Sequence, residues 1–168
     1  MGLSYELQRR HWMYLNGVIL VSPADYKLLE FEDGQEDAID SSLHLPYYAA
    51  TAWYHKMLDN NLQSLDLLEF LPDVEDFTIN KLIPAIAKGG FLNEKERNFI
   101  AEKYSYYSGL DKQFIIDYNL EVPNYAFWKE LLRKREGLTI GRLDSRYKGL
   151  DKTNAGISPD SNIELDSW

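Results

Sequence analysis

Hydrophobic positions repeat with a helical period over most of this chain, and the pattern is strongest between residues 43 and 58. Pro46 suits the first turn of a helix, where its missing N–H would have no partner anyway. Behind it, Tyr47, Ala50, Tyr54 and Met57 fall on one face at helical spacing. Most of the remaining face is apolar as well, which is typical of a buried helix. The pattern therefore predicts a central helix around which the other segments pack.

Start and stop signals predict several further helices. Ser64 is expected to cap a helix that Pro72 kinks or ends, and a continuation is expected to stop at Gly89-Gly90. The remaining signals are, in order, the capping box Asn93 with Glu96, then Gly109, Asp111, Pro123-Asn124 and Gly137. Five or six helices joined by short polar turns predict a mainly α fold, a helical bundle.

The N-terminal segment has a different pattern. Residues Leu3 to Tyr14 are expected to form the end of a helix, and Val18 to Val21 form a continuous apolar run closed by Ser22-Pro23. Such a run is typical of a strand buried on both faces of a parallel sheet, yet the rest of the chain holds no second one. We therefore predict a helix–strand stub of an α/β-hydrolase sheet. Because an uncovered strand favours association, Val18–Val21 is expected to pair in a homodimer or to pack against the bundle.

These patterns divide the chain into four parts. Residues 1–23 form the helix–strand remnant, 24–42 an acidic linker, 43–137 the helical bundle, and 138–168 an extended return segment with a polar tail. The acidic residues around Gly34 do not match the alternating pattern of a calcium loop, so a solvated loop is expected there. The tail from Lys148 is expected to be poorly ordered unless another part of the chain holds it.

A charged row lies in the return segment. If residues 139–147 are extended, Arg142, Asp144 and Arg146 share one face. They are expected to form structural ion pairs that fix the chain where it leaves the bundle. Recognition of a carboxylate by the arginines is the alternative.

Composition narrows the classes of partner. The net charge of −9 argues against nucleic acid and against an anionic membrane surface. The chain has no Cys, so thiolate chemistry is excluded. Residues 1–10 carry no apolar core of a signal peptide, and the longest apolar run is far too short to span a bilayer, so no membrane insertion is expected.

No complete catalytic set is visible. Ser4 follows Gly2-Leu3, but Glu6 stands where a nucleophile elbow needs its second glycine. His44 and His55 lie 11 residues apart, which is poor spacing for a shared metal. We expect each of His11, His44 and His55 to be a hydrogen-bonded or surface histidine. Neither a metal nor a cofactor is expected.

Three segments in order carry a family resemblance. They are Asn16-Gly17-Val18-Ile19-Leu20-Val21-Ser22, then Pro46-Tyr47-Tyr48-Ala49-Ala50-Thr51-Ala52-Trp53-Tyr54-His55, then Gly141-Arg142-Leu143-Asp144-Ser145-Arg146. Together they resemble the middle of a serine carboxypeptidase-like peptidase of the α/β-hydrolase fold. The Ser108-Gly109-Leu110 stretch and the helix after it are also similar to that family.

The resemblance implies that this chain covers the end of the nucleophile helix, one strand and the helical lid. The family's nucleophile elbow would then precede residue 1, and its catalytic Asp and His would follow residue 168, so this chain alone is expected to be inactive. The parent reaction would be the release of C-terminal residues from peptides, and a full-length parent would be exported or periplasmic. Aromatic residues of the central helix would be substrate-pocket candidates, namely Tyr47, Tyr48, Trp53, Tyr54 and His55. The alternative is a non-enzymatic helical module that binds a protein partner.

Overall fold

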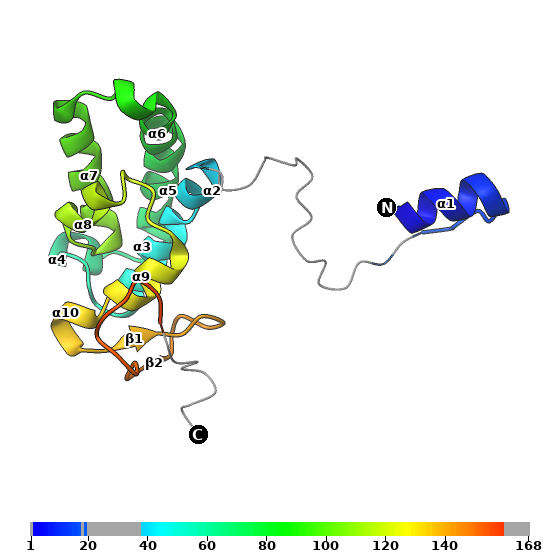
Figure 1. The fold of residues 1–168 in the computed structure, drawn as a ribbon. Helices are drawn as coiled ribbons and strands as arrows, with labels where there is room; N and C mark the ends of the chain where they lie inside the picture. Colours follow the sequence, from blue (N-terminus) through cyan, green and yellow to red (C-terminus); the bar gives the residue numbers. More distant parts are fainter. Residues whose placement is uncertain (1, 18, 20–37, 160–168) are drawn as a thin grey trace. The chain divides into compact units, whose positions relative to one another are not determined.

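The computed structural model describes residues 2–17, 19 and 38–159 of the chain (Figure 1). The chain divides into two units, Met1–Gln35 and Glu36–Trp168, and each is described by itself. The described part is mainly helical, as the periodicity predicts.

The first unit contains helix α1, Gly2–His11. Arg9, Arg10 and His11 occupy its last turn, where cations interact favourably with the helix dipole. Ser4 lies inside this continuous helix rather than on a strand-to-helix turn, so the geometry of a nucleophile elbow is absent at Ser4. The strand and the dimer contact are predicted at Val18–Val21. Residues 18, 20 and 21 of that run lie outside the described residues, so both stay predictions. Within that run only Ile19 is described, and its side chain is exposed.

The second unit is built from short helices and one hairpin. Its elements are α2 Ala38–Leu43, α3 Leu45–Tyr54, α4 Asn60–Gln63, α5 Leu67–Phe77, the π-helical turn η1 Thr78–Leu82, α6 Ile83–Lys88, the 3₁₀ turn η2 Gly89–Phe91, α7 Glu94–Ser108, α8 Lys112–Asp117, α9 Asn124–Glu130, α10 Arg133–Glu136, β1 Thr139–Ile140 and β2 Lys148–Gly149. Helix α2 begins inside the segment expected to be an acidic linker, so the last residues of that segment are helical.

The helix caps follow local sequence in most cases. The side chain of Asn93 accepts from Glu96 N at 2.9 Å, and Asp111 accepts from Gln113 N at 2.9 Å. Gly109 ends α7 with φ of 70°, and a Cβ there would meet the carbonyl oxygen of Met57 at 3.0 Å, so both the backbone conformation and the close approach favour glycine. The Ser64 cap is wrong: Asp66 begins α5 instead, accepting from Leu68 N at 2.9 Å.

Helix α5 runs past Pro72 instead of ending there. Proline removes one backbone donor, but the helix continues through η1 and α6 to Gly89, where φ is 51°. Thr78 opens the π-helical turn, and its hydroxyl donates to Val74 O at 2.7 Å. Of the two outcomes expected at Pro72, an end of the helix is excluded.

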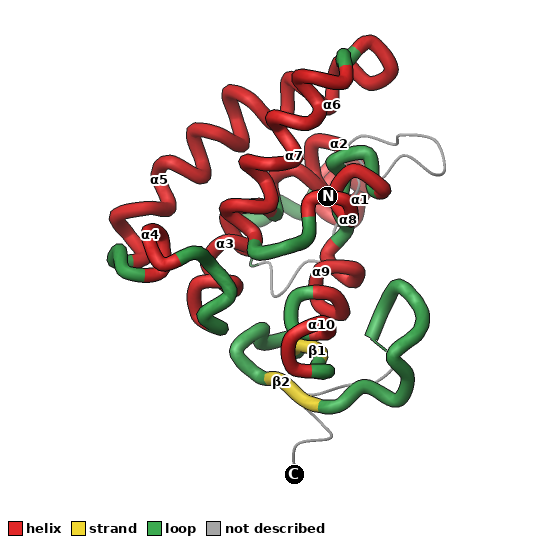
Figure 2. The backbone as a smooth tube through the Cα atoms, turned by 90° about the vertical axis from the view of Figure 1, so that its left-hand side faces the viewer, coloured by secondary structure: helices red, strands yellow, loops and turns green. Residues whose placement is uncertain are grey.

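Helix α3 lies in the centre of the bundle, packed against α2, α5 and α7 (Figures 1 and 2). Its buried face differs from the expected one, which centred on Tyr47, Ala50, Tyr54 and Met57. The side chains that face the core are Leu45, Tyr48, Ala49, Thr51 and Ala52, while Tyr54 is 52% exposed. Both faces are apolar, so the position of the partner helices decides which is buried.

The Tyr48 ring stacks on Phe127 of α9, with centroids 3.9 Å apart and planes 12° from parallel. Both rings are fully buried, and the Tyr48 hydroxyl donates to Val122 O at 3.0 Å. This pair joins the central helix to the C-terminal third of the bundle. Because aromatic side chains bury a large apolar area, the contact is expected to contribute strongly to stability.

Helix α7 buries an unsatisfied hydroxyl. Tyr104 has no exposed surface, its Oη has no hydrogen-bond partner among the described residues, and burial raises its pKa far above the ordinary range. An unpaired buried polar atom costs about 1–3 kcal/mol. We therefore expect Tyr104→Phe to raise the free energy of unfolding by about 1 kcal/mol in a urea titration. A loss of stability in the Phe variant would show that the hydroxyl has a stabilising partner.

The segment after β2 is held against α9. Lys129, which is 2% exposed, lies 2.9 Å from Asp151 Oδ2 and donates to Thr153 O at 3.0 Å. Arg133 donates to Asn154 O at 3.2 Å and pairs with the buried Glu130. The tail from Lys148 is expected to be ordered only where another part of the chain contacts it. These contacts with α9 and α10 fix it as far as residue 154.

Candidate functional site

Two of the segments that carry the resemblance meet in space. The turn that joins β1 to β2 packs against the C-terminal end of α3, although 90 or more residues separate them in sequence. The Thr51 and Ser145 hydroxyls lie 3.1 Å apart, and His55 Nε2 lies 2.7 Å from the Ser145 carbonyl oxygen. We name Thr51, His55, Glu136 and residues 144–148 the hairpin cluster. It brings together three sequence-predicted site residues, His55, Asp144 and Arg146, from two distant segments.

The turn at the hairpin cluster is closed by backbone and side-chain bonds. Gly141 N donates to Tyr147 O at 2.9 Å, and Tyr147 N donates to Asp144 O at 3.1 Å. Arg146 donates to both oxygens of Asp144, the shorter contact being 2.6 Å. The segment is thus a tight turn between two short strands rather than an extended row. Arg142 is exposed and takes no part in that ion pair.

The Asp144–Arg146 pair gives a pH prediction. Hydrogen bonds from the Arg146 side chain, and then from its backbone N–H, lower the pKa of Asp144 from 3.8 to about 2. Since the folded-state pKa is depressed, the pair stabilises the fold above about pH 4 and loses its effect as the pH falls towards 2. We expect the stability difference between wild type and Asp144→Asn to shrink over that interval in denaturant titrations. A difference that stays constant from pH 5 to about 2 would contradict this assignment.

His55 is oriented by the turn rather than by a nucleophile. A carbonyl oxygen can only accept, so Nε2 carries the proton that it donates to Ser145 O. The Ser145 hydroxyl is instead within hydrogen-bond distance of Thr51. In this arrangement His55 Nε2 cannot take a proton from Ser145, so the two do not form a nucleophile–base pair.

An ion pair closes the other side of the hairpin cluster. Lys148 Nζ lies 2.6 Å from Glu136 Oε2, and that hydrogen bond, with smaller electrostatic contributions from Arg135 and His55, lowers the Glu136 pKa. Glu136 and Lys148 were not predicted as site residues. Glu136 and Lys148 come together because β1 pairs with β2, which places Lys148 opposite Ile140 and near the end of α10. That pairing joins segments that sequence alone does not bring together.

The pocket candidates on α3 lie in different surroundings. Tyr48 has no exposed surface, because its ring is stacked on Phe127. Tyr47 accepts at its hydroxyl from Trp128 Nε1 at 3.0 Å, and Trp53 Nε1 donates to Leu65 O at 3.1 Å. Tyr54 remains exposed beside His55, with the two rings at 5.1 Å. Of these candidates, His55 belongs to the hairpin cluster and Tyr54 lies beside it.

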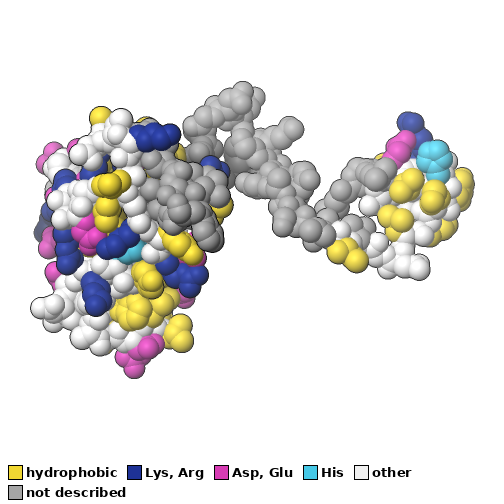
Figure 3. Space-filling model, turned by 90° about the horizontal axis from the view of Figure 1, so that it is seen from below, with side chains coloured by type: hydrophobic (Ala, Val, Ile, Leu, Met, Phe, Trp, Pro, Cys, Tyr) yellow, Lys and Arg dark blue, Asp and Glu magenta, His cyan; other side chains and the backbone are white. Residues whose placement is uncertain are grey.

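The end of the unit that carries the hairpin shows hydrophobic side chains interspersed with Lys and Arg (Figure 3). Leu143 in the turn and Leu150 after β2 are each more than three-quarters exposed. Within residues 2–17, 19 and 38–159, no three His, Asp or Glu side chains are grouped as metal ligands would be. No described helix is both long and apolar enough to cross a membrane.

No family model, no curated protein and no solved structure matches this chain. The resemblance to serine carboxypeptidase-like peptidases therefore stays a proposal that rests on the sequence segments named above.

Proposed function

We propose that residues 43–137 form the helical lid, and residues 138–168 the return segment, of a serine carboxypeptidase-like hydrolase whose catalytic residues lie in sequence outside this chain. One observation carries the proposal: the segments Pro46–His55 and Gly141–Arg146, which resemble that family, contact each other through Thr51, His55 and Ser145. Segments that belong to one site are expected to converge in the fold even when they are distant in sequence.

The role of such a lid is to shape the substrate approach and to exclude water from the acyl-enzyme chemistry. The exposed Tyr54 and the partly buried His55 are the residues of this chain best placed to contact a peptide. The Asp144–Arg146 pair and the bond from His55 to Ser145 O would hold the turn in a fixed conformation. The nucleophile, its base and the oxyanion hole would come from the catalytic core.

The second candidate is a helical module that binds a protein partner and has no catalytic role. An open groove beside α6 and α7, lined by apolar and basic side chains, favours it. The two candidates differ in what they require: a lid needs a catalytic core, whereas a binding module needs only the groove.

A serine-reactive fluorophosphonate probe tests the assignment of the catalytic residues. We expect the purified chain to show no labelling and no peptidase or esterase turnover, because the proposed nucleophile elbow lies outside this chain and His55 Nε2 donates to Ser145 O, which leaves that nitrogen unable to activate the Ser145 hydroxyl. Catalytically active α/β-hydrolase protein, treated in parallel, is the positive control for the probe. Labelling that disappears in Ser145→Ala or Ser4→Ala would make this chain an enzyme by itself and overturn the lid proposal.

A further inference from the structure

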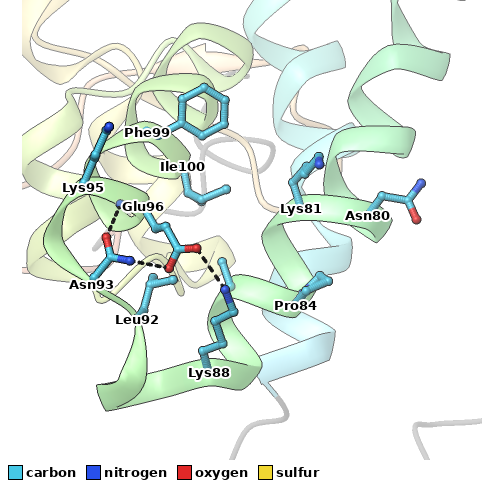
Figure 4. A pocket seen from close by; sticks show the side chains of 11 residues that line it. Asn80, Lys81, Pro84, Lys88, Leu92, Asn93, Lys95, Glu96, Phe99 and Ile100 are labelled. Carbon is cyan, nitrogen blue, oxygen red and sulfur yellow. Dashed lines mark hydrogen bonds and ion pairs between the residues drawn. The ribbon is translucent and has the colours of Figure 1, made fainter.

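A groove of about 600 Å³ lies between the η1–α6 segment and the first half of α7 (Figure 4). The two walls diverge from the η2 turn, which contains Gly89 and Gly90. Ala85 on the α6 wall has a small side chain, which leaves space between the two walls. The groove lies at the other end of the bundle from the hairpin cluster and shares no residue with it (Figure 1).

The floor of the groove is apolar. Ala85, Leu92 and Ile100 are buried beneath it, and Phe99 stands at its edge with 54% of its side chain exposed. Figure 4 shows Phe99 and Ile100 on one wall and Pro84 on the opposite wall. A half-exposed Phe beside a concave apolar surface is the kind of feature that marks a docking site.

Cations surround this floor. Lys88 lies 3.1 Å from Glu96, whose other oxygen accepts from Asn93, so these three groups satisfy one another. Lys81 and Lys95 also line the groove, and neither makes an ion pair with any described residue. Lys and Arg nearly balance Asp and Glu over residues 38–159, so most of the net charge of −9 lies outside this part of the chain. The lining of the groove includes three Lys and one Glu, so the groove itself is locally basic.

We propose that this groove binds an acidic amphipathic helix of a partner protein. Apolar side chains at i, i+3 and i+4 of such a helix would contact Phe99 and the floor, and carboxylates flanking that stripe would pair with Lys81 and Lys95. Lys81 and Lys88 stand two helical turns apart on one wall, with Lys95 on the other. Cations spread along both walls fit several separated carboxylates better than the single one of a small ligand. This inference does not depend on the lid proposal.

Fluorescence anisotropy on the full chain tests the proposal. The probes are labelled synthetic helices of about five turns, each with a Leu stripe flanked by Glu, in a small panel that shifts the stripe register. We expect at least one probe to bind, with an affinity that falls as salt is added. Lys81→Glu with Lys95→Glu should weaken binding about tenfold or more, and Phe99→Ser should weaken it comparably.

Three controls make the result decisive. Lys56→Glu with Lys152→Glu changes the net charge equally at exposed positions that do not line the groove, and it should leave binding unchanged. A probe with Lys in place of Glu should not bind, and circular dichroism should show that every variant is folded. Failure of the whole panel, or binding that ignores the groove variants, would overturn the proposal. If decanoate binds and no peptide does, the ligand of the groove is a small carboxylate, and the proposal is overturned. If no peptide binds and the chain self-associates in a way that Phe99→Ser abolishes, the occupant is a second copy of this chain, and the proposal is likewise overturned.

Discussion

Phe127→Ala is expected to lower the free energy of unfolding by about 3–5 kcal/mol, a large fraction of the stability of a domain of this size. Phe127 is fully buried and its ring lies 3.9 Å from the ring of Tyr48, so truncation leaves a cavity beside the central helix. Urea titration followed by tryptophan fluorescence measures the effect, since Trp53 and Trp128 are both packed against this core.

Tyr48→Phe is the matched control, because it keeps the stacked ring and removes only the hydroxyl that donates to Val122 O. Its expected cost is about 1–2 kcal/mol, for one buried hydrogen bond. If Phe127→Ala cost no more than Tyr48→Phe, the stacked pair would not be the main link between α3 and α9.

Asp151→Ala is expected to cost about 3 kcal/mol, because it leaves the Lys129 ammonium buried without its carboxylate. The two groups are 2.9 Å apart, and their side chains are 2% and 7% exposed. The same variant should release the segment after β2 from α9. Limited proteolysis should therefore detect cleavage near residues 152–157 in the variant at protease concentrations that leave the wild type intact.

The double variant Lys129→Met with Asp151→Leu controls for the buried charge. It removes both charges, and we expect it to recover most of the lost stability, because an apolar pair can replace a buried ion pair. Asp144→Ala breaks an ion pair at the surface and should have a much smaller effect. Equal losses in Asp151→Ala and Asp144→Ala would contradict a special role for the buried pair.

Local signals in the sequence predict most of the helix ends. The caps at Asn93 and Asp111 and the glycine ends at Gly109 and Gly137 depend on neighbours within a few residues, and all four are confirmed. The Ser64 cap failed for a local reason as well. Asp66 offers a carboxylate two residues later, next to the first apolar residue of α5.

Contacts between distant segments could not be predicted in the same way. Periodicity shows that α3 is apolar nearly all round, but only the positions of Phe127 and Val122 decide that Tyr48, and not Tyr54, is buried. The burial of Lys129 could not be predicted from neighbouring residues either, because a lysine is expected at the surface unless its partner is known. Asp151 comes from a polar tail that sequence alone predicts to be poorly ordered.

The hairpin cluster combines residues that local sequence singles out with a contact between distant segments that it does not predict. The sequence singles out the Gly141–Arg146 motif and His55, but the bond between them depends on the return of the chain after α10. The expected row of Arg142, Asp144 and Arg146 assumed an extended segment. A turn places Asp144 and Arg146 together and leaves Arg142 outside the pair.

The most direct test of the lid proposal is to determine the coding sequence on both sides of this chain in the source genome. We expect a Gly-x-Ser-x-Gly elbow in frame upstream of residue 1, and an Asp and a His of the hydrolase core in frame downstream of residue 168. In-frame stop signals on both sides, with no such residues between them and this chain, would contradict the lid proposal and leave the partner-binding module as the function.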